Sequence, residues 1–115
     1  MKLVYFNVYG RGEPTRMALN HAKMPFEDSR VEFAEWGAMK AAKGPSYALP
    51  AFEHEGIVMN QSISILRYVG ILTGAYPKDD PKTCWAADAT IDDQSDYCKD
   101  VPMMVFFGKE AANEE

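Results

Sequence analysis

Residues 3–16 read LVYFNVYGRGEPTR, and this stretch predicts a strand, a turn and a helix in immediate succession. Residues 2–8 are rich in Val, Tyr, Phe and Leu, which favours a buried strand. The Gly-Arg-Gly triplet would end the strand, and the Glu-Pro pair after it is typical of a helix with proline in its first turn. We expect this helix to turn Met17 inward and to end before Pro25.

The segments that follow alternate between strands and helices. We predict a second strand at residues 26–31, an alanine-rich helix at 33–43 and a strand hairpin that turns at Glu55-Gly56. A helix with one apolar face begins at Ser62; the apolar positions are Ile65, Leu66, Val69 and Leu72. The predicted order is βαβ followed by ββα, an α/β fold in which the first two strands are parallel and the hairpin adds antiparallel strands.

A second compositional region begins after this unit. Residues 76–81 read YPKDDP, which is typical of a linker, and a further helix is expected from Lys82 to Asp100. We therefore divide the chain into a domain at 1–75, a linker at 76–81 and a helical segment at 82–115.

Composition excludes some classes of partner. The chain has 115 residues and a net charge of -5, and no basic block for phosphate contacts, so nucleic acid is not an expected partner. The first apolar run is too short for a signal peptide and no stretch approaches a membrane span, so we expect no membrane partner. Cys84 and Cys98 lack metal-type spacing and favour reduced thiols in a cytoplasmic protein.

Three local features could carry chemistry. A helix that begins at Gln61-Ser62 would direct unpaired N–H groups and a positive dipole end toward a carboxylate, although Ser62 taken alone is more simply explained as an N-cap. A cis peptide bond at Leu49-Pro50 would turn the Leu49 backbone outward to pair with an extended peptide, although Pro50 could simply begin a strand. Taken alone, Tyr5 is better explained as a core or sheet aromatic than as a catalytic residue.

Together these features match a known family. Residues 3–16 resemble the opening of glutathione transferases of the sigma, alpha, mu and pi types, with sigma the nearest. Trp36 with Lys40 four residues later, Leu49-Pro50, and Gln61-Ser62 eleven residues after the proline continue the pattern in register, as does the triplet Leu66-Arg67-Tyr68. The resemblance extends from residue 1 to about residue 100.

The resemblance implies a thioredoxin-like fold for residues 1–75, with glutathione bound along its edge as co-substrate and no other cofactor or metal. Tyr5 would activate the thiol, which would then attack a small electrophile. The implied glutathione-binding residues are Tyr5, Arg11, Trp36, Lys40, Leu49, Pro50, Gln61 and Ser62. The family also implies a homodimer in which a helix acid of the neighbouring subunit, here best matched by Asp96, meets the γ-glutamyl ammonium group.

The thiol chemistry suits these residue types. A free thiol has a pKa near 8.5, so only a few per cent is thiolate at neutral pH. A phenol O–H donated to sulfur stabilises the charged form, and lowering the thiol pKa by ~2 requires only about 2.7 kcal/mol.

The chain departs from the family pattern in three places. Ala48 stands where many relatives carry Gln or Lys, and the loop before Pro50 is about one residue longer, so Lys43 competes with Lys40 for the glycine carboxylate. The helical segment is also much shorter than the helical domain of the family, which predicts a truncated product or a dimer contact for the apolar residues 103–107.

Other functions remain as alternatives. The short helical segment leaves open a non-catalytic binding or structural module, and the sigma-like resemblance also admits a glutathione-dependent prostaglandin isomerase. Asp88, Asp92 and Asp96 share a helix face that could hold a divalent cation, but a solvated acidic face is the favoured interpretation. A thioredoxin-type oxidoreductase is disfavoured because no cysteine lies near the first predicted helix.

Overall fold

The computed structural model describes residues 1–97 and divides the chain into two compact units. The first unit is Met1–Tyr76, and the second begins at Pro77. The predicted apolar run at 103–107, Cys98 and the end of the last predicted helix lie outside the described residues.

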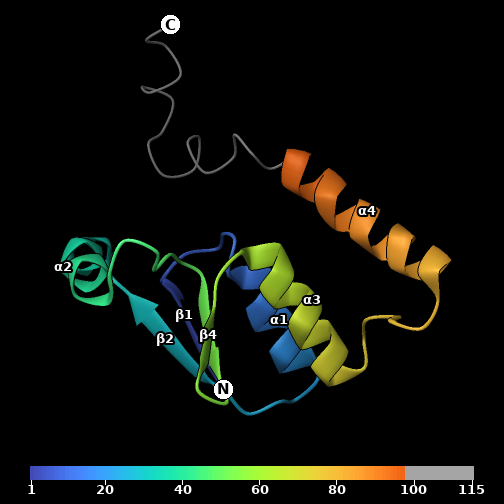
Figure 1. Cartoon of the computed structure of the whole chain (residues 1–115), viewed down its shortest axis with the longest axis horizontal. Helices are drawn as coiled ribbons and strands as arrows, with labels where there is room; N and C mark the ends of the chain where they lie inside the picture. Colours follow the sequence, from blue (N-terminus) through green and yellow to red (C-terminus); the bar gives the residue numbers. More distant parts are fainter. Residues whose placement is uncertain (98–115) are drawn as a thin grey trace, which may run out of the picture. The chain divides into compact units, whose positions relative to one another are not determined.

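The first unit contains four strands and three helices in the predicted order βαβ then ββα (Figure 1). In chain order they are β1 (Lys2–Phe6), α1 (Glu13–His21), β2 (Glu27–Val31), α2 (Phe33–Lys43), β3 (Ala51–His54), β4 (Ile57–Met59) and α3 (Ser62–Thr73). The hairpin between β3 and β4 turns at Glu55 and Gly56, both with positive φ, which is the backbone conformation of a tight hairpin turn.

The sheet has the strand order β2-β1-β3-β4. β1 and β2 are parallel, with Tyr5 opposite Arg30, whereas β3 runs antiparallel to both β1 and β4. This mixed sheet is the arrangement that the sequence predicts, because a helix connects the parallel pair and a tight turn connects the antiparallel pair.

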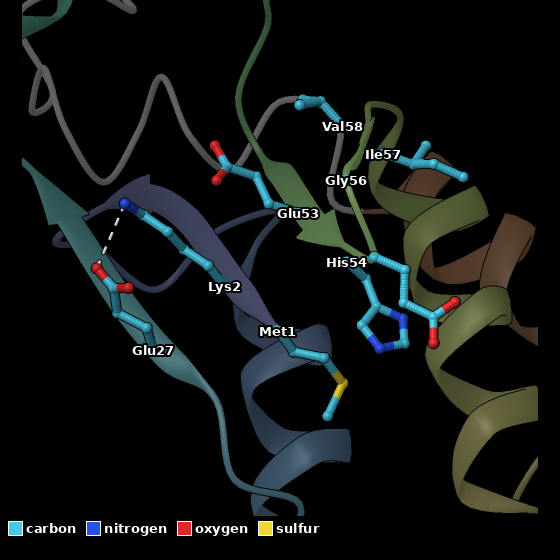
Figure 2. Close-up of a pocket in the computed structure, with 9 residues that line it drawn as sticks. Met1, Lys2, Glu27, Glu53, His54, Gly56, Ile57 and Val58 are labelled. Atoms are coloured by element: carbon cyan, nitrogen blue, oxygen red, sulfur yellow. Dashed lines mark ion pairs between the residues drawn. The ribbon is translucent and has the colours of Figure 1, made fainter.

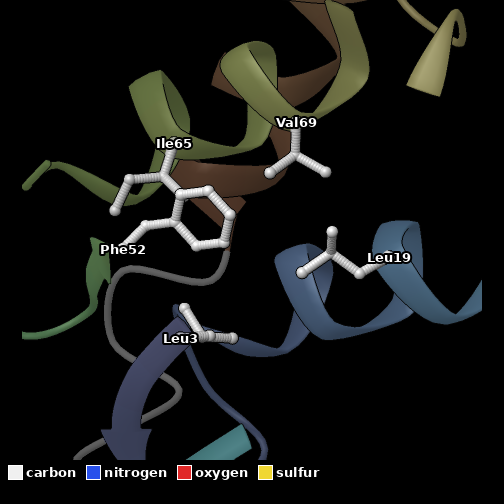
Figure 3. Close-up of a cluster of buried hydrophobic side chains, with 5 residues drawn as sticks. All are labelled: Leu3, Leu19, Phe52, Ile65 and Val69. Carbon is white, nitrogen blue, oxygen red and sulfur yellow. The ribbon is translucent and has the colours of Figure 1, made fainter. Parts of the chain in front are cut away.

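Two apolar clusters cover the two faces of the sheet. Leu3 and Phe52 project from the sheet toward Leu19 of α1 and Ile65 and Val69 of α3, and all five are buried (Figure 3). On the other face, α2 covers a cluster made by Val4, Val31, Tyr47 and Ala51. Because side chains alternate along a strand, Tyr5 shares the face of Leu3, while Phe6 shares the face of Val4.

The inward face of α1 differs from the sequence prediction. Met17 is 63% exposed, and the buried residues of this helix are Thr15, Arg16 and Leu19. Met17 was therefore the wrong choice of core residue, because hydrophobicity alone does not reveal that an arginine with enough polar partners can take a buried position.

The second unit contains α4 (Pro81–Tyr97). Asp80 stands before the helix and accepts hydrogen bonds from the Thr83 hydroxyl and the Lys82 amide N–H, so it supplies acceptors for the otherwise unpaired first turn. Within residues 1–97, no helix combines the length and the apolar character that a membrane crossing requires.

Candidate functional site

The sheet register brings three separate sequence motifs to one end of the sheet. β1 ends beyond Tyr5, and β3 begins opposite Val4 at Ala51, so Leu49 and Pro50 lie beside the end of β1. β4 runs antiparallel to β3 and ends at Met59, opposite Phe52, so the chain reaches Gln61 and Ser62 at the same end. We call Tyr5, Leu49, Pro50, Gln61 and Ser62 the strand-end cluster.

Tyr5 is the most constrained residue of this cluster. Its side chain is buried, and its phenol oxygen accepts a hydrogen bond of 3.0 Å from the main-chain N–H of Arg11. A Cβ atom at Gly10 would lie 2.7 Å from the phenol oxygen, and one at Gly12 would lie 2.5 Å from the ring. The loop can therefore close on the Tyr5 ring because both positions lack a side chain.

A buried cation also lies next to the Tyr5 ring. The guanidinium carbon of Arg16 is 5.6 Å from the centroid of the Tyr5 ring. Arg16 forms ion pairs with Asp28 at 2.9 Å and Glu13 at 3.1 Å, so its charge is compensated within the protein. Burial would raise the pKa of Asp28, but hydrogen bonds from Arg16 and Arg30 outweigh burial and lower that pKa from its usual value.

A second cationic group lies on the face covered by α2. The Lys40 ammonium is 5.5 Å from the Trp36 ring centroid and donates a hydrogen bond of 3.3 Å to the main-chain oxygen of Tyr47. Trp36 also contacts the ring of Phe6, the residue after Tyr5, with centroids 6.0 Å apart. Lys43, the alternative carboxylate ligand, lies instead over the Tyr47 ring at 5.6 Å.

The Leu49-Pro50 peptide bond is cis, which confirms the conformation predicted for this step. The Leu49 side chain packs against the cluster that contains Tyr47 and Ala51, so its backbone is anchored next to the strand ends. Pro50 is buried.

Gln61 and Ser62 stand at the N-terminus of α3. Gln61 is the N-cap residue and has φ of 74°, which is uncommon for a residue other than glycine and is found disproportionately at ligand sites. Ser62 is the first residue of the helix rather than its cap, so the N-cap interpretation of Ser62 was wrong. The first turn of α3 is the anion-attracting end of the helix.

Asp96 lies on α4 in the second unit, and the structure does not relate it to the strand-end cluster. Among the residues that the structure describes, no three His, Cys, Asp or Glu side chains are grouped so that they could hold a metal ion. This finding gives no support to a cation site on the acidic face of α4.

A separate surface pocket of about 510 Å³ lies at the opposite end of β1. Its lining includes Lys2, Glu27, Glu53 and His54, and Figure 2 shows the ion pair between Lys2 and Glu27. Lys2 pairs with Glu53 in the sheet register, three residues before Tyr5, so this pocket is distinct from the strand-end cluster. Its carboxylates are spread along the strands and turn, and it contains none of the residues of the predicted site.

The sequence interpretation missed several residues that build the site. The sequence predicts Gly10 and Gly12 only as residues that end a strand, although their lack of a side chain lets the loop approach Tyr5. It gives Arg16 no role beyond its place in a motif, and it gives Tyr47 no role. The partner that explains the burial of Arg16 is Asp28 on β2, twelve residues further along the chain. For the glycines and Tyr47, the signal lies in tertiary contacts and not in local sequence.

Comparison with known proteins identifies consistent relatives. Residues 1–70 match the model of the glutathione S-transferase N-terminal domain. A glutathione S-transferase of Anopheles gambiae is 33% identical over 96 residues, which are 84% of this chain and 46% of the relative. The hematopoietic prostaglandin D synthase of Rattus norvegicus is 34% identical over 96 residues, covering 84% of this chain and 47% of the relative.

Solved structures agree with the sequence comparison. The structure of prostaglandin synthase D of Nilaparvata lugens matches with a TM-score of 0.80 and 32% identity, covering 96% of this chain and 55% of the other. This likeness confirms the predicted thioredoxin-like α/β fold. The chain spans about half the length of the relatives that it matches.

Proposed function

Because the chain belongs to the glutathione transferase family, we propose that it binds glutathione at the strand-end cluster and ionises the glutathione thiol at Tyr5 for attack on a small electrophile. Glutathione serves as co-substrate, and the reaction that we propose needs no resident metal or prosthetic group.

The observation that carries this proposal is the hydrogen bond from the Arg11 N–H to the Tyr5 phenol oxygen. A phenol has one proton to donate and lone pairs to accept. With the Arg11 N–H directed at a lone pair, the Tyr5 proton remains available for the sulfur of glutathione. Accepting one hydrogen bond also polarises the O–H group and strengthens it as a donor. A thiolate stabilised in this way is the reactive nucleophile, and it needs only to be positioned next to the electrophile.

The remaining parts of glutathione fit the groups around Tyr5. The N-terminus of α3 at Gln61 and Ser62 offers N–H donors for the γ-glutamyl carboxylate. The Leu49 backbone, next to the strand ends, suits an extended pairing with the cysteinyl part. Lys40, held beside Trp36, supplies a cation for the glycine carboxylate, and Arg11 orders the loop over Tyr5.

We also propose the finer features that the resemblance implies. These are a sigma-type protein in the cytoplasm, a detoxifying role, and a homodimer in which Asp96 of one protomer meets the γ-glutamyl ammonium bound by the other. The charge of Asp96 is suited to that contact. Solution mass, together with glutathione affinity of Asp96→Asn, tests the dimer; a monomer with unchanged affinity contradicts it.

Isomerisation of a prostaglandin precursor is the second candidate function. The relatives named hematopoietic prostaglandin D synthase and the Nilaparvata lugens structure favour it, at an identity similar to that of the Anopheles gambiae transferase. Both reactions begin with the same glutathione thiolate at Tyr5. They differ in whether glutathione remains in the product or is released.

The deciding experiment measures binding and turnover of the same purified chain. Calorimetry at millimolar glutathione tests binding, a chlorinated nitrobenzene tests conjugation, and a prostaglandin endoperoxide tests isomerisation. Conjugation supports the first function, and isomerisation without consumption of glutathione supports the second. Binding with no turnover would favour a non-catalytic glutathione-binding module, and absence of binding would contradict all three.

A further inference from the structure

Arg16 is a buried cation that the proposed thiol chemistry does not use. It is 2% exposed, and hydrogen bonds occupy all three of its nitrogens. A guanidinium costs much free energy to bury unless its donors are satisfied, so such complete pairing points to a specific role for its position.

The partners of Arg16 join the end of β1 to the loop after it. One terminal nitrogen donates to the Phe6 carbonyl at 3.0 Å, and the other donates to the Val8 carbonyl at 3.2 Å. Phe6 is the last residue of β1, and Val8 lies in the loop that covers Tyr5. The planar fork of arginine can hold two backbone oxygens in fixed relative positions, which the single ammonium of lysine cannot do.

Asp28 connects this fork to a second arginine. One carboxylate oxygen of Asp28 accepts from Arg16 at 2.9 Å, and the other accepts from Arg30 at 2.9 Å. Arg30 in turn donates to the Asn7 side chain at 2.7 Å, so the loop is held from two directions by arginines that share one carboxylate. The network contains two positive and two negative side chains, from Arg16, Arg30, Asp28 and Glu13, so its net charge is zero. Its effect on the loop must therefore come from the positions of its hydrogen bonds and not from a net charge.

We propose that Arg16, anchored by Asp28, is a positioning residue that holds the loop so that the Arg11 N–H reaches the Tyr5 phenol oxygen, and thereby sets how readily bound glutathione ionises. The effect on glutathione ionisation rests on the proposed function. The effect on the loop does not, because it concerns the protein without ligand: the Arg11 N–H is protected because Arg16 fixes the carbonyls of Phe6 and Val8.

The test uses Arg16→Lys in the full chain, which keeps the charge and removes the fork. Thiolate absorbance followed against pH gives the pKa of the bound glutathione thiol, and NMR hydrogen exchange gives protection of the Arg11 amide. We expect the thiol pKa to rise by about one pH unit and Arg11 exchange to accelerate about tenfold relative to the amides of β1. In a Tyr5→Phe background, Arg16→Lys should produce no further rise in the thiol pKa.

Asp28→Asn is the second variant, and it decides the question if Arg16→Lys does not fold. It keeps the side-chain shape and weakens the anchor, so Arg11 exchange should accelerate and the thiol pKa should rise. A purely electrostatic effect would lower that pKa, because a negative charge near the thiolate is lost. Lys2→Gln breaks the ion pair with Glu27 at the other end of β1 and should leave both readouts at wild-type values.

The outcomes separate this inference from the proposed function. A folded variant with unchanged Arg11 exchange and unchanged thiol pKa overturns the role of Arg16. So does acceleration that is equal throughout β1 and the loop, because that would be general destabilisation. Failure of wild-type protein to ionise glutathione contradicts the proposed function, and the exchange measurement, which needs no ligand, still decides whether Arg16 positions the loop.

Discussion

The phenol oxygen of Tyr5 lies 3.0 Å from the main-chain nitrogen of Arg11, six residues further along the chain. Because this N–H occupies an acceptor site of the phenol, the Tyr5 proton is the group that remains to be donated to a sulfur atom. The contact joins a strand end to the turn that starts α1. Changes to either partner should therefore affect thiol ionisation more than folding.

Tyr5→Phe tests the donor directly. The ring and its packing are kept, while the donor to the thiolate is lost, so kcat/KM at neutral pH should fall about 10- to 100-fold because a hydrogen bond to a charged group is worth ~1.5–3 kcal/mol. Glutathione affinity should change much less, since the peptide contacts remain. Steady-state conjugation rates and calorimetry check both expectations.

Tyr9→Phe is the matched control for that substitution. Tyr9 lies in the loop after β1 and is 87% exposed, so loss of its hydroxyl should leave the rate at the wild-type value. An unchanged rate in Tyr5→Phe, or an equal loss in the two variants, would remove Tyr5 from the proposed mechanism.

Gly10→Ala should impair thiol activation by a steric route. The added methyl group would lie 2.7 Å from the phenol oxygen, so either Tyr5 or the loop must shift. We expect kcat/KM to fall at least about tenfold, because a displacement of about 1 Å at a reacting group is costly. Kinetics and the thiol titration provide the measurement.

Gly37→Ala supplies the comparison for Gly10→Ala. A Cβ at Gly37 meets no atom within 4 Å, and the residue lies inside α2, so alanine should raise stability by about 0.5–1 kcal/mol and leave the rate unaltered. Equal activity in the two variants would show that the approach of Gly10 to Tyr5 has no functional importance.

Lys40→Gln and Lys43→Gln distinguish the two candidate ligands of the glycine carboxylate. Lys40 is held between the Trp36 ring and the Tyr47 carbonyl, whereas Lys43 lies over the Tyr47 ring. We expect Lys40→Gln to raise KM for glutathione about tenfold with kcat nearly constant, because a charge-assisted contact that is equal in ground and transition states is lost. A larger effect from Lys43→Gln would reverse this assignment.

The sequence predicts the order of the strands and helices well because each feature has a local cause. The proline after the Gly-Arg-Gly triplet, the apolar face of α3 and the Glu55-Gly56 turn depend on neighbouring residues alone. Tyr5, Pro50 and Gln61 lie at the same end of the sheet once the β3–β4 hairpin pairs with β1. These parts of the site are therefore consequences of topology.

Other parts of the site depend on contacts between distant residues. The burial of Arg16 needs Asp28 from β2 and carbonyls from the end of β1 and the loop, and no periodicity in α1 encodes these partners. Hydrophobicity consequently favours Met17 over Arg16 as the inward residue. The choice between Lys40 and Lys43 likewise depends on where Tyr47 places its ring and carbonyl, which the loop conformation decides.

Leu19→Ala should destabilise the first unit. Leu19 is fully buried between the sheet and α3, together with Leu3 and Val69, and loss of its side chain leaves a cavity (Figure 3). The free energy of unfolding should fall by about 2–5 kcal/mol. Leu72, which the apolar periodicity places with Ile65 and Val69, is 39% exposed instead, so this part of the prediction was wrong. Leu72→Ala should therefore cost under about 1.5 kcal/mol, and comparable losses by denaturant unfolding would contradict the described core.

Asp28 should make the stability of the protein sensitive to acid. Its pKa is lowered in the folded state, because hydrogen bonds from Arg16 and Arg30 outweigh the effect of burial. A group with a lowered folded pKa contributes stability above its unfolded pKa, about 3.9, and that contribution is lost as the pH falls through the lower folded value. Asp28→Asn should therefore be less stable than wild type by about 1–3 kcal/mol at pH 7, with this difference in stability narrowing below about pH 4.

Denaturant unfolding at a series of pH values measures this gap in stability. Asp79→Asn is the control: it removes an exposed ion pair to Lys78 and should differ from wild type by under about 1 kcal/mol at pH 7. A gap for Asp28→Asn that stays constant down to pH 2 would mean that the Asp28 carboxylate does not contribute through its charge.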